Sequence, residues 1–213
     1  MPTPVVFVVD DDISVRESLE LLIESAGWRV ELFASAQDFL AHPRANVPCC
    51  LILDVSLPDL NGLELQHRIA TDRVELPIVF ITGHGDIPMS VRAMKAGAIE
   101  FLTKPFNDEA LLGAIRNAIE CSTAALSRET EMKVLRESYA SLSQRERQVM
   151  SLVVTGLLNK QVGGELGISE ITVKAHRGRV MRKMKAGSLA DLVKMAAQLR
   201  LVPPTTRNHP SVH

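Results

Sequence analysis

Hydrophobic positions in the first half of the chain follow two alternating periods. Short apolar runs, typical of buried strands, are separated by segments in which apolar residues recur every three or four positions, as on amphipathic helices. The runs span residues 5–9, 29–33, 49–53, 77–82 and 99–103. The helical segments span 14–26, 35–40, 62–69 and 87–96, with a last one from 107 onward. Five strands alternating with five helices predict a doubly wound α/β domain around a five-stranded parallel sheet.

The second half of the chain has helical periodicity alone. Ser143, with Glu146 three residues later, predicts a capping box at the start of a helix that Gly156 ends. Gly167 supplies the turn before a longer helix that Ser169 caps. The predicted helices span 143–155, 159–166, 169–184 and 188–201. This order predicts an all-α domain of four helices that contains a helix-turn-helix.

The stretch between the two halves favours one long helix. Residues 107–140 contain no proline and a single glycine, Gly113. Apolar residues form a stripe up to Ile119 and then become sparse and mixed with charges, so the helix leaves its domain and continues as a polar-faced linker that sets the spacing of the domains. The predicted organisation is 1–121 for the α/β domain, 122–140 for the helical linker, 141–201 for the helix-turn-helix domain and 202–213 for a disordered tail.

The formal net charge of −1 conceals opposite charges in the two halves. Residues 1–121 hold 18 acidic and 9 basic side chains, whereas residues 122–213 hold 7 acidic and 15 basic ones. Within 141–201 the balance is 11 basic against 4 acidic residues. An acidic domain joined to a basic one predicts two modules with different partners, and the basic module is a candidate for nucleic-acid binding.

Hydropathy and cysteine usage indicate a cytoplasmic protein without a membrane partner. No apolar stretch approaches the length of a membrane span, and the N-terminal residues lack the basic region of a signal peptide. Cys49 and Cys50 are adjacent and Cys121 stands alone, so they form neither a metal-binding C-x-x-C pair nor a disulfide framework. We expect all three to be small buried hydrophobic residues.

Charged and polar side chains follow four of the predicted strands. Asp54 ends an apolar run, a position that by itself suits a turn or a helix cap as well as a functional site. Asp10 and Asp11 follow the first strand, Thr82 ends the fourth and Lys104 follows the fifth. The C-terminal ends of parallel strands meet at one edge of a sheet, so we expect these five side chains to converge. Three carboxylates with no His or Cys favour Mg²⁺, and the lysine and the hydroxyl suit a phosphoryl group.

These side chains belong to an ordered set of motifs along residues 4–121. The motifs are Val8-Val9-Asp10-Asp11-Asp12, Asp54 with Pro58-Asp59-x-Asn61-Gly62, Thr82-Gly83 and Lys104-Pro105-Phe106. The set resembles the receiver domain of bacterial two-component response regulators, which has a flavodoxin-like fold. The stretch 82–89 is similar to the FixJ-like branch of that family, and we interpret its His84 as a solvated loop residue rather than a catalytic one.

The resemblance implies a role for each of these residues. Asp54 would be the phosphoacceptor, taking phosphate from the phosphohistidine of a sensor histidine kinase, with Thr82 and Lys104 holding the phosphoryl oxygens. Phe101 would be an aromatic switch that responds to Thr82. The implied Mg²⁺ ligands are Asp11, Asp54 and the backbone carbonyl of Ser56, with Asp10 acting through water. The Lys104-Pro105 bond would be cis, and the helix 87–96 with the neighbouring strand and helix would form a phosphorylation-dependent dimer interface.

The basic helix 169–184 has two distinct sides on a helical wheel. Val173, Val180 and Met184 form the side expected to be buried. The opposite side holds Ile171, Ala175, Gly178 and Arg182, flanked by Lys174 and Arg179. Small residues here would let the backbone approach a major groove, with cations on either side.

A second set of motifs covers about 60 residues of the basic half. The motifs are Leu142-Ser143-x-Arg145-Glu146, Gly156-Leu157-x-Asn159-Lys160, Leu166-x-Ile168-Ser169, Thr172-Val173-Lys174-x-His176 and Lys183-Met184. The set is similar to the LuxR/NarL-type DNA-binding domain. That resemblance places Lys174, Ala175 and Gly178 at base-facing positions and makes the last helix a dimer surface on DNA. The predicted phosphate contacts are Lys160, Thr172, His176, Arg177 and Arg179.

Two departures from the family's pattern bear on this domain. Gly178 has no side chain to contact a base, so specificity relies more on Lys174 and its neighbours. Gly163-Gly164 lies within a helix where the family usually has better helix formers. Each glycine costs about 1 kcal/mol relative to alanine, so we expect a weakened domain.

The leading hypothesis is a phosphorylation-dependent transcriptional regulator and not an enzyme. Its predicted partners are a sensor histidine kinase, double-stranded promoter DNA, RNA polymerase and a second copy of the chain. The alternative is a Mg²⁺-dependent phosphatase or phosphotransferase with Asp54 as nucleophile, although haloacid-dehalogenase-like enzymes usually carry a second acid where Ser56 stands. A third hypothesis, a regulator that acts through protein partners alone, predicts no salt-sensitive DNA binding.

Overall fold

The computed structural model describes residues 3–43, 46–72, 76–83 and 86–201. The interpretation of His84 and the tail predicted at 202–213 both lie outside these residues. The chain divides into two compact units, Met1–Arg128 and Glu129–His213. Among the described helices, none combines the length and hydrophobicity needed to cross a membrane.

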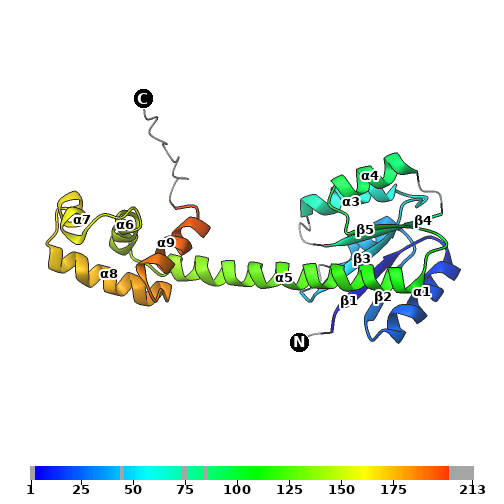
Figure 1. The fold of residues 1–213 in the computed structure, drawn as a ribbon, viewed down its shortest axis with the longest axis horizontal. Coiled ribbons are helices and arrows are strands. Elements are labelled where there is room, and N and C mark those ends of the chain that lie inside the picture. Colours follow the sequence, from blue (N-terminus) through cyan, green and yellow to red (C-terminus); the bar gives the residue numbers. More distant parts are fainter. Residues whose placement is uncertain (1–2, 44–45, 73–75, 84–85, 202–213) are drawn as a thin grey trace, which may run out of the picture. The chain divides into compact units, whose positions relative to one another are not determined.

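The first unit is built on a five-stranded sheet with the strand order β2-β1-β3-β4-β5 (Figure 1). All neighbouring strands pair in parallel. The strands are β1 (Val5–Val9), β2 (Arg29–Phe33), β3 (Cys49–Asp54), β4 (Ile78–Thr82) and β5 (Glu100–Thr103). The predicted doubly wound fold is therefore confirmed, and every strand delivers its C-terminal end to the same edge.

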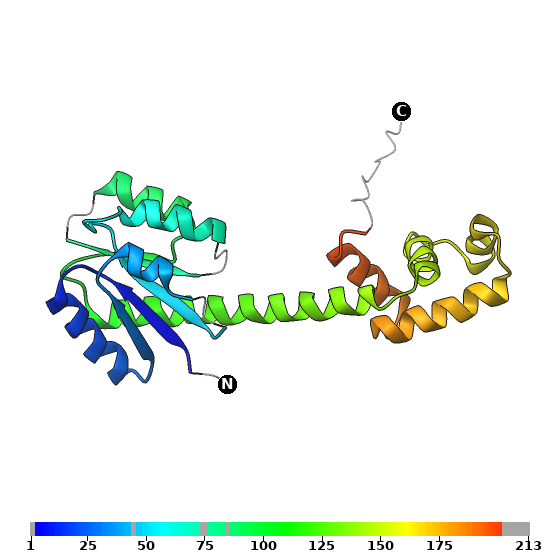
Figure 2. The same cartoon turned by 180° about the vertical axis from the view of Figure 1, so that it is seen from behind.

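Helices cover both faces of this sheet, as Figures 1 and 2 show. Side chains alternate along each strand, so Val5, Phe7 and Val9 of β1 face one core while Val6 and Val8 face the other. The first core includes α2 (Ala36–Ala41), α3 (Gly62–Asp72) and α4 (Ile87–Lys95); the second includes α1 (Ile13–Ser25) and α5 (Asp108–Ala140). Burial on both faces explains why the strands read as continuous apolar runs.

Glycines end two of these helices as the sequence predicts. Gly27 follows α1 with φ +85° and Gly97 follows α4 with φ +92°, conformations that L side chains rarely adopt. Differences from the predicted boundaries are small. The largest difference in this unit is at α3, which continues to Asp72 instead of ending at residue 69.

Helix α5 is continuous over 33 residues, which confirms the predicted long helix. The segment predicted as a linker nevertheless begins with contacts to the first unit: Ser122 and Ala125 are buried, and the Ser122 hydroxyl accepts a hydrogen bond from the Cys49 amide at 3.0 Å. Leu135 and Tyr139, near the other end, pack against the core of the second unit. Cys121 is exposed on this helix, so the prediction that all three cysteines are buried is wrong for Cys121.

The second unit contains the four predicted helices after α5. They are α6 (Gln144–Val153), α7 (Asn159–Leu166), α8 (Glu170–Met184) and α9 (Leu189–Gln198). The capping box of Ser143 and Glu146 is present, and Gly167 adopts φ +64° at the end of α7. Ser169 accepts a hydrogen bond from the Thr172 amide at the start of α8. The helix-turn-helix arrangement of α7 and α8 is thus confirmed.

Gly163 requires a correction to the expected weakness of α7. A Cβ atom at this position would lie 2.7 Å from the Ile168 carbonyl oxygen, closer than real Cβ atoms approach. The Ile168 amide in turn donates to the Gly163 carbonyl at 3.0 Å, so the helix and the turn after it are in close contact here. Gly164 has open space around it, so only Gly164 carries the simple helix-propensity cost.

Candidate functional site

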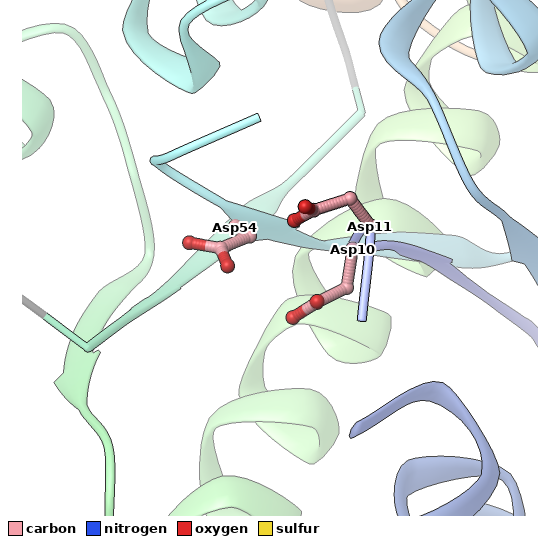
Figure 3. Close-up of side chains that lie close together, drawn as sticks. All are labelled: Asp10, Asp11 and Asp54. Carbon is pink, nitrogen blue, oxygen red and sulfur yellow. The ribbon is translucent and has the colours of Figure 1, made fainter. Parts of the chain in front are cut away.

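Three carboxylates gather at the C-terminal edge of the sheet (Figure 3). Asp10 and Asp11 follow β1, and Asp54 ends β3 beside it. One oxygen of each carboxylate can be chosen so that all lie within 4.8 Å of one another. Asp10 is fully buried, Asp54 is 6% exposed and Asp11 is exposed, so the cluster opens to solvent on one side. A set of hard oxygen donors at this spacing fits a divalent cation such as Mg²⁺.

Lys104 joins two of these carboxylates. Its ammonium nitrogen Nζ donates to Asp10 Oδ2 at 2.6 Å and to Asp54 Oδ2 at 3.0 Å. The Lys104 amide also donates to the Thr82 carbonyl at 2.7 Å, which fixes the chain just after β5. The following bond to Pro105 is cis, as predicted. The structure therefore brings the ends of β1, β3 and β5 to one ion-pair cluster.

Burial and neighbouring charges shift the pKa values of Asp10 and Lys104. Burial raises the pKa of Asp10, and hydrogen bonds from Lys104 and from the Asp12 amide offset part of that rise. For Lys104, burial acts to lower the pKa, but its hydrogen bonds and charge interactions with Asp10 and Asp54 outweigh burial and raise it. Lys104 is thus held as an ammonium ion among carboxylates, and a cation at this position suits the binding of an anionic group.

The loop after β3 folds tightly against Asp54. The Ser56 amide donates to Asp54 Oδ1 at 3.1 Å, so both carboxylate oxygens of Asp54 have hydrogen-bond donors. The Gly62 amide donates a hydrogen bond to the Val55 carbonyl at 3.0 Å. A Cβ atom at Gly62 would lie 2.5 Å from the Asp54 carbonyl oxygen, so only glycine fits this approach.

Thr82 and Phe101 lie on the strands next to Asp54. Asp54 pairs with Ile81 of β4, which places Thr82 one residue further toward the same edge. Thr82 is fully buried, whereas Phe101 is half-buried, with its ring centroid 6.1 Å from that of Phe80. These positions are consistent with the pair that the sequence singled out, although the switch itself stays a prediction.

Two supporting contacts were not predicted from the sequence. The Arg16 guanidinium donates to the Asp10 backbone carbonyl at 2.7 Å. The Asp59 carboxylate accepts a hydrogen bond from the Gln37 amide at 3.0 Å, which joins the start of α2 to the loop after Asp54. The Asp59 contact joins segments 22 residues apart, whereas Arg16 lies only six residues from Asp10. The basic residue in the first turn of α1 was the available signal for Arg16.

Helix α8 has the two sides that the helical wheel predicts. Val173, Val180 and Met184 are buried against the rest of the unit. The residues predicted to face DNA differ in exposure: Lys160, Lys174, Ala175, Gly178 and Arg179 are exposed, and Thr172, His176 and Arg177 are half-buried. Ile171 is 80% exposed. From Ile171 to Gly178 the exposed side of α8 therefore has an uncharged centre with cations on its borders, and Arg182 continues the same side toward the C-terminal end of the helix.

Several basic residues of the second unit stabilise its fold. Arg145 donates to the Leu166 carbonyl at 2.6 Å, which joins α6 to α7. Arg147 donates to the Ala140 carbonyl at 2.9 Å and lies over the Tyr139 ring, 5.3 Å from its centroid. These contacts occupy the guanidinium groups within the domain, so they account for part of the basic excess that suggested nucleic-acid binding.

An ion pair between an exposed lysine and a buried glutamate joins α8 to the start of α6. Lys183 Nζ donates to Glu146 Oε2 at 2.7 Å and to the Ser141 carbonyl at 3.0 Å. Glu146 also accepts the Ser143 amide at 2.8 Å, and its side chain is 5% exposed. The hydrogen bond from Lys183, followed by that from the Ser143 amide, lowers the pKa of Glu146. The Lys183-Met184 motif thus has a structural basis in this pair.

Two of the predicted phosphate contacts, His176 and Arg177, are half-buried. Arg177 donates to Asn159 Oδ1 at 3.2 Å, which joins α8 to the start of α7. His176 Nδ1 is buried and has no hydrogen-bond partner among the described residues. Lys174 is paired with Glu170 at 3.0 Å, but both side chains are exposed, and such pairs contribute little. Their DNA contacts stay predictions.

Comparison with known proteins now identifies both units. The family model "Response regulator receiver domain" matches residues 6–116, and the model "Bacterial regulatory proteins, luxR family" matches residues 140–196. The chain belongs to the FixJ/NarL-type response regulators. A receiver joined to a LuxR-type domain makes this response regulator a phosphorylation-dependent regulator of transcription. The receiver implies a histidine kinase partner, and the LuxR-type domain implies DNA binding.

Relatives match this response regulator over nearly its whole length. Nodulation protein W of Bradyrhizobium diazoefficiens is 51% identical over 195 residues, covering 92% of this chain and 86% of that protein. Transcriptional regulatory protein FixJ of the same species is 44% identical over 192 residues, covering 90% and 93%. The solved structure of response regulator StyR is 49% identical with a TM-score of 0.82, covering 92% of this chain and all of that one.

Proposed function

We propose that Asp54 accepts a phosphoryl group from the phosphohistidine of a sensor histidine kinase and that this event controls DNA binding by α8. The observation that carries the proposal is the Lys104 ammonium, which lies 3.0 Å from Asp54 and 2.6 Å from Asp10. Strand ends far apart in the sequence meet there, so a single turn residue at position 54 does not explain the arrangement.

The chemistry follows from the side chains present. A carboxylate oxygen of Asp54 attacks phosphorus, forming an acyl phosphate, while the bond from phosphorus to the kinase imidazole breaks. The electron pair of that bond returns to the imidazole nitrogen. Lys104 and the Thr82 hydroxyl stabilise the transferred phosphoryl oxygens, and the tight loop at Gly62 holds Asp54 in position.

The donor set around Asp54 fits Mg²⁺. Asp11, Asp54 and the Ser56 backbone carbonyl would hold the ion directly, with Asp10 acting through water. When bound, Mg²⁺ supplies positive charge that screens the phosphoryl oxygens from the carboxylates. The Lys104 ammonium neutralises only part of the charge of the three acids, which supports a further cation at this site.

The phosphorylated receiver dimerises through α4, β5 and the neighbouring face of α5. The Thr82 hydroxyl turns toward the phosphoryl group and Phe101 moves into the space it leaves, which changes this face. Ile87, Val91 and Met94 support the assignment, because they recur at helical spacing on α4 and are 80%, 44% and 44% exposed. A receiver that stays monomeric by size-exclusion chromatography with light scattering, after acetyl phosphate treatment, would contradict this step.

The paired C-terminal units then bind promoter DNA and engage RNA polymerase. Two-fold symmetry of the dimer predicts an inverted repeat with half-sites about one helical turn apart. Leu189 and Val193 are 37% and 39% exposed one turn apart on α9, which supports its role as the dimer surface on DNA. Replacing Lys174 by alanine should weaken and relax base recognition, whereas replacing Arg179 should weaken binding evenly across sequences.

Regulation rather than turnover is the proposed outcome of phosphorylation. Neither matched family is a phosphatase. Ser56 occupies the position where a dehalogenase-like enzyme would carry its second acid, and its amide serves only to orient Asp54. Genomic footprinting of the wild type beside Asp54→Ala tests the whole proposal: protected sites should disappear in the variant, and unchanged footprints would refute phosphorylation control.

A further inference from the structure

Ile171 is a large aliphatic side chain that the described residues of its own unit leave mostly uncovered. It lies in the first turn of α8 with 80% of its surface exposed, whereas Val173, two residues later, is fully buried. Exposed isoleucine gains nothing from the hydrophobic effect, so its burial against another molecule is favourable.

The neighbours of Ile171 define what that molecule is. Ile171, Ala175 and Gly178 follow one another at successive turns on the side of α8 opposite its buried residues, and we call them the α8 strip. Ala175 and Gly178 are exposed, and a Cβ atom at Gly178 would meet no other atom. Lys174 and Arg179, both exposed, border the strip. An apolar strip between cations complements a major groove, whose base edges lie between two rows of phosphates.

The chemistry of Ile171 restricts what it can read in the groove. Residues at the N-terminal end of a recognition helix contact base edges, and Ile171 is the second residue of α8. Isoleucine neither donates nor accepts hydrogen bonds. The only apolar group that an unmodified base pair presents in the major groove is the C5-methyl group of thymine.

We propose that Ile171 packs against the C5-methyl group of a thymine and thereby specifies that base in each half-site. The inference rests on the proposed DNA-binding role of α8 and adds the chemical group that is recognised. The small residues at positions 175 and 178 let the helix come close enough for this contact. 5-Methylcytosine carries the same methyl group, so it is a second base that Ile171 would accept in its place.

The test uses the full-length protein, treated with acetyl phosphate and Mg²⁺, and a pool of random synthetic duplexes. After selection of a preferred duplex, each thymine is replaced in turn by deoxyuridine, which removes only the methyl group. For the wild type, one thymine position in each half-site should be sensitive to this replacement. Binding should weaken about fourfold there, which is the effect expected for losing one buried methyl group. Ile171→Ala should bind more weakly and lose this sensitivity, because nothing then packs against the methyl group.

Leu158→Ala is the matched control, since Leu158 is 70% exposed in the same unit but lies before α7. This variant should still bind the thymine duplex about fourfold more tightly than the deoxyuridine duplex. In a further arm, a cytosine placed at the sensitive position should bind more tightly when it carries a 5-methyl group, in the wild type only.

The outcomes separate this inference from the function on which it rests. If selection returns no preferred duplex, sequence-specific DNA binding fails and the inference fails with it. The inference alone is overturned if a duplex is selected but replacing each thymine by deoxyuridine leaves the affinity unchanged. It is also overturned if Ile171→Ala still loses affinity about fourfold on that replacement. Sensitivity that disappears in Ile171→Ala and persists in Leu158→Ala supports it.

Discussion

The two units of the chain use charged side chains in opposite ways. In the receiver, Asp10, Asp54 and Lys104 are buried or partly buried and face one another, so their shared role is visible in the protein alone. In the C-terminal unit, Lys183 and Arg179 are both exposed on α8, but Lys183 is paired with the buried carboxylate of Glu146. Buried charges need partners within the protein, whereas exposed cations are solvated and do not reveal a role in the protein alone. Sign and position along the sequence therefore identify the charged site of the first unit, whereas in the second unit they do not identify which cations contact their own fold.

The largest expected effect tests the receiver side of this comparison. Asp54→Asn should abolish phosphoryl acceptance from acetyl phosphate, because an amide oxygen is a far weaker nucleophile than a carboxylate. The measurement is the mass increase of the intact protein in the presence of Mg²⁺. Asp59→Asn is the control, since Asp59 lies in the same loop but only accepts amide hydrogen bonds from α2. Equal labelling of Asp54→Asn and the wild type would place the phosphoacceptor elsewhere.

Removing Lys104 should affect both stability and chemistry. Lys104→Ala leaves Asp10 buried beside Asp54 without their cation, which we expect to cost about 3 kcal/mol of unfolding free energy. Phosphoryl acceptance should slow about 100-fold. Mg²⁺ should raise the melting temperature more in this variant than in the wild type, since the carboxylates then attract the ion more strongly.

Differential scanning fluorimetry with and without Mg²⁺ measures this difference. Lys95→Ala, which removes an exposed lysine from the same unit, should behave as the wild type does. An equal response to Mg²⁺ in Lys104→Ala and the wild type would show that Lys104 and the ion do not share the carboxylates.

A smaller effect is expected in the C-terminal unit. Glu146→Gln removes the charge that pairs with Lys183, so α6 and α8 should lose about 2 kcal/mol of local stability at neutral pH. Because the pKa of Glu146 is lowered from its ordinary value of 4.5, the stabilisation is fully present above pH 4.5 and is lost as pH falls through the lowered pKa. Wild type and variant should therefore converge in acid.

Hydrogen exchange of the full-length protein, followed by mass spectrometry of α6 and α8 peptides, measures this local stability. Glu165→Gln, at an exposed position of α7, is the control and should match the wild type at every pH. A Glu146→Gln difference that persists unchanged at low pH would assign the effect to packing rather than charge.

The smallest effect separates two adjacent glycines. Gly164→Ala should stabilise α7 by about 1 kcal/mol, because open space surrounds the position. Gly163→Ala gains the same helix propensity but must displace the Ile168 carbonyl, so it should be less stable than Gly164→Ala. Exchange of α7 amides compares the two variants, and equal stabilisation would show that the turn relaxes freely.

The sequence predicts much of the receiver because local patterns determine it. All five strands and the convergence of Asp10, Asp11, Asp54, Thr82 and Lys104 follow from apolar runs and from the rule that parallel strands end at one edge. The contact of Asp59 with Gln37 could not be predicted, because it joins segments 22 residues apart. The glycine at 163 was likewise misjudged, since its close neighbour is a backbone atom in the following turn.

In the C-terminal unit the helices and their caps were predictable. Which basic side chains bond within the domain, and which stay exposed, was not. Arg145 and Arg179 look alike in the sequence. Only the folded structure shows that Arg145 is bonded to the Leu166 carbonyl, 21 residues away, while Arg179 is exposed. Periodicity identifies which face of a helix is buried. It does not identify which long side chains form hydrogen bonds within their own domain.

The central claim is that phosphorylation of Asp54 controls DNA binding by the C-terminal unit. The most direct test measures the affinity of the full-length protein for a selected duplex, with and without acetyl phosphate in the presence of Mg²⁺, for the wild type and Asp54→Asn. We predict that acetyl phosphate raises the affinity of the wild type and leaves Asp54→Asn at the untreated level. An equal rise in both proteins, or no rise in the wild type, would contradict the claim.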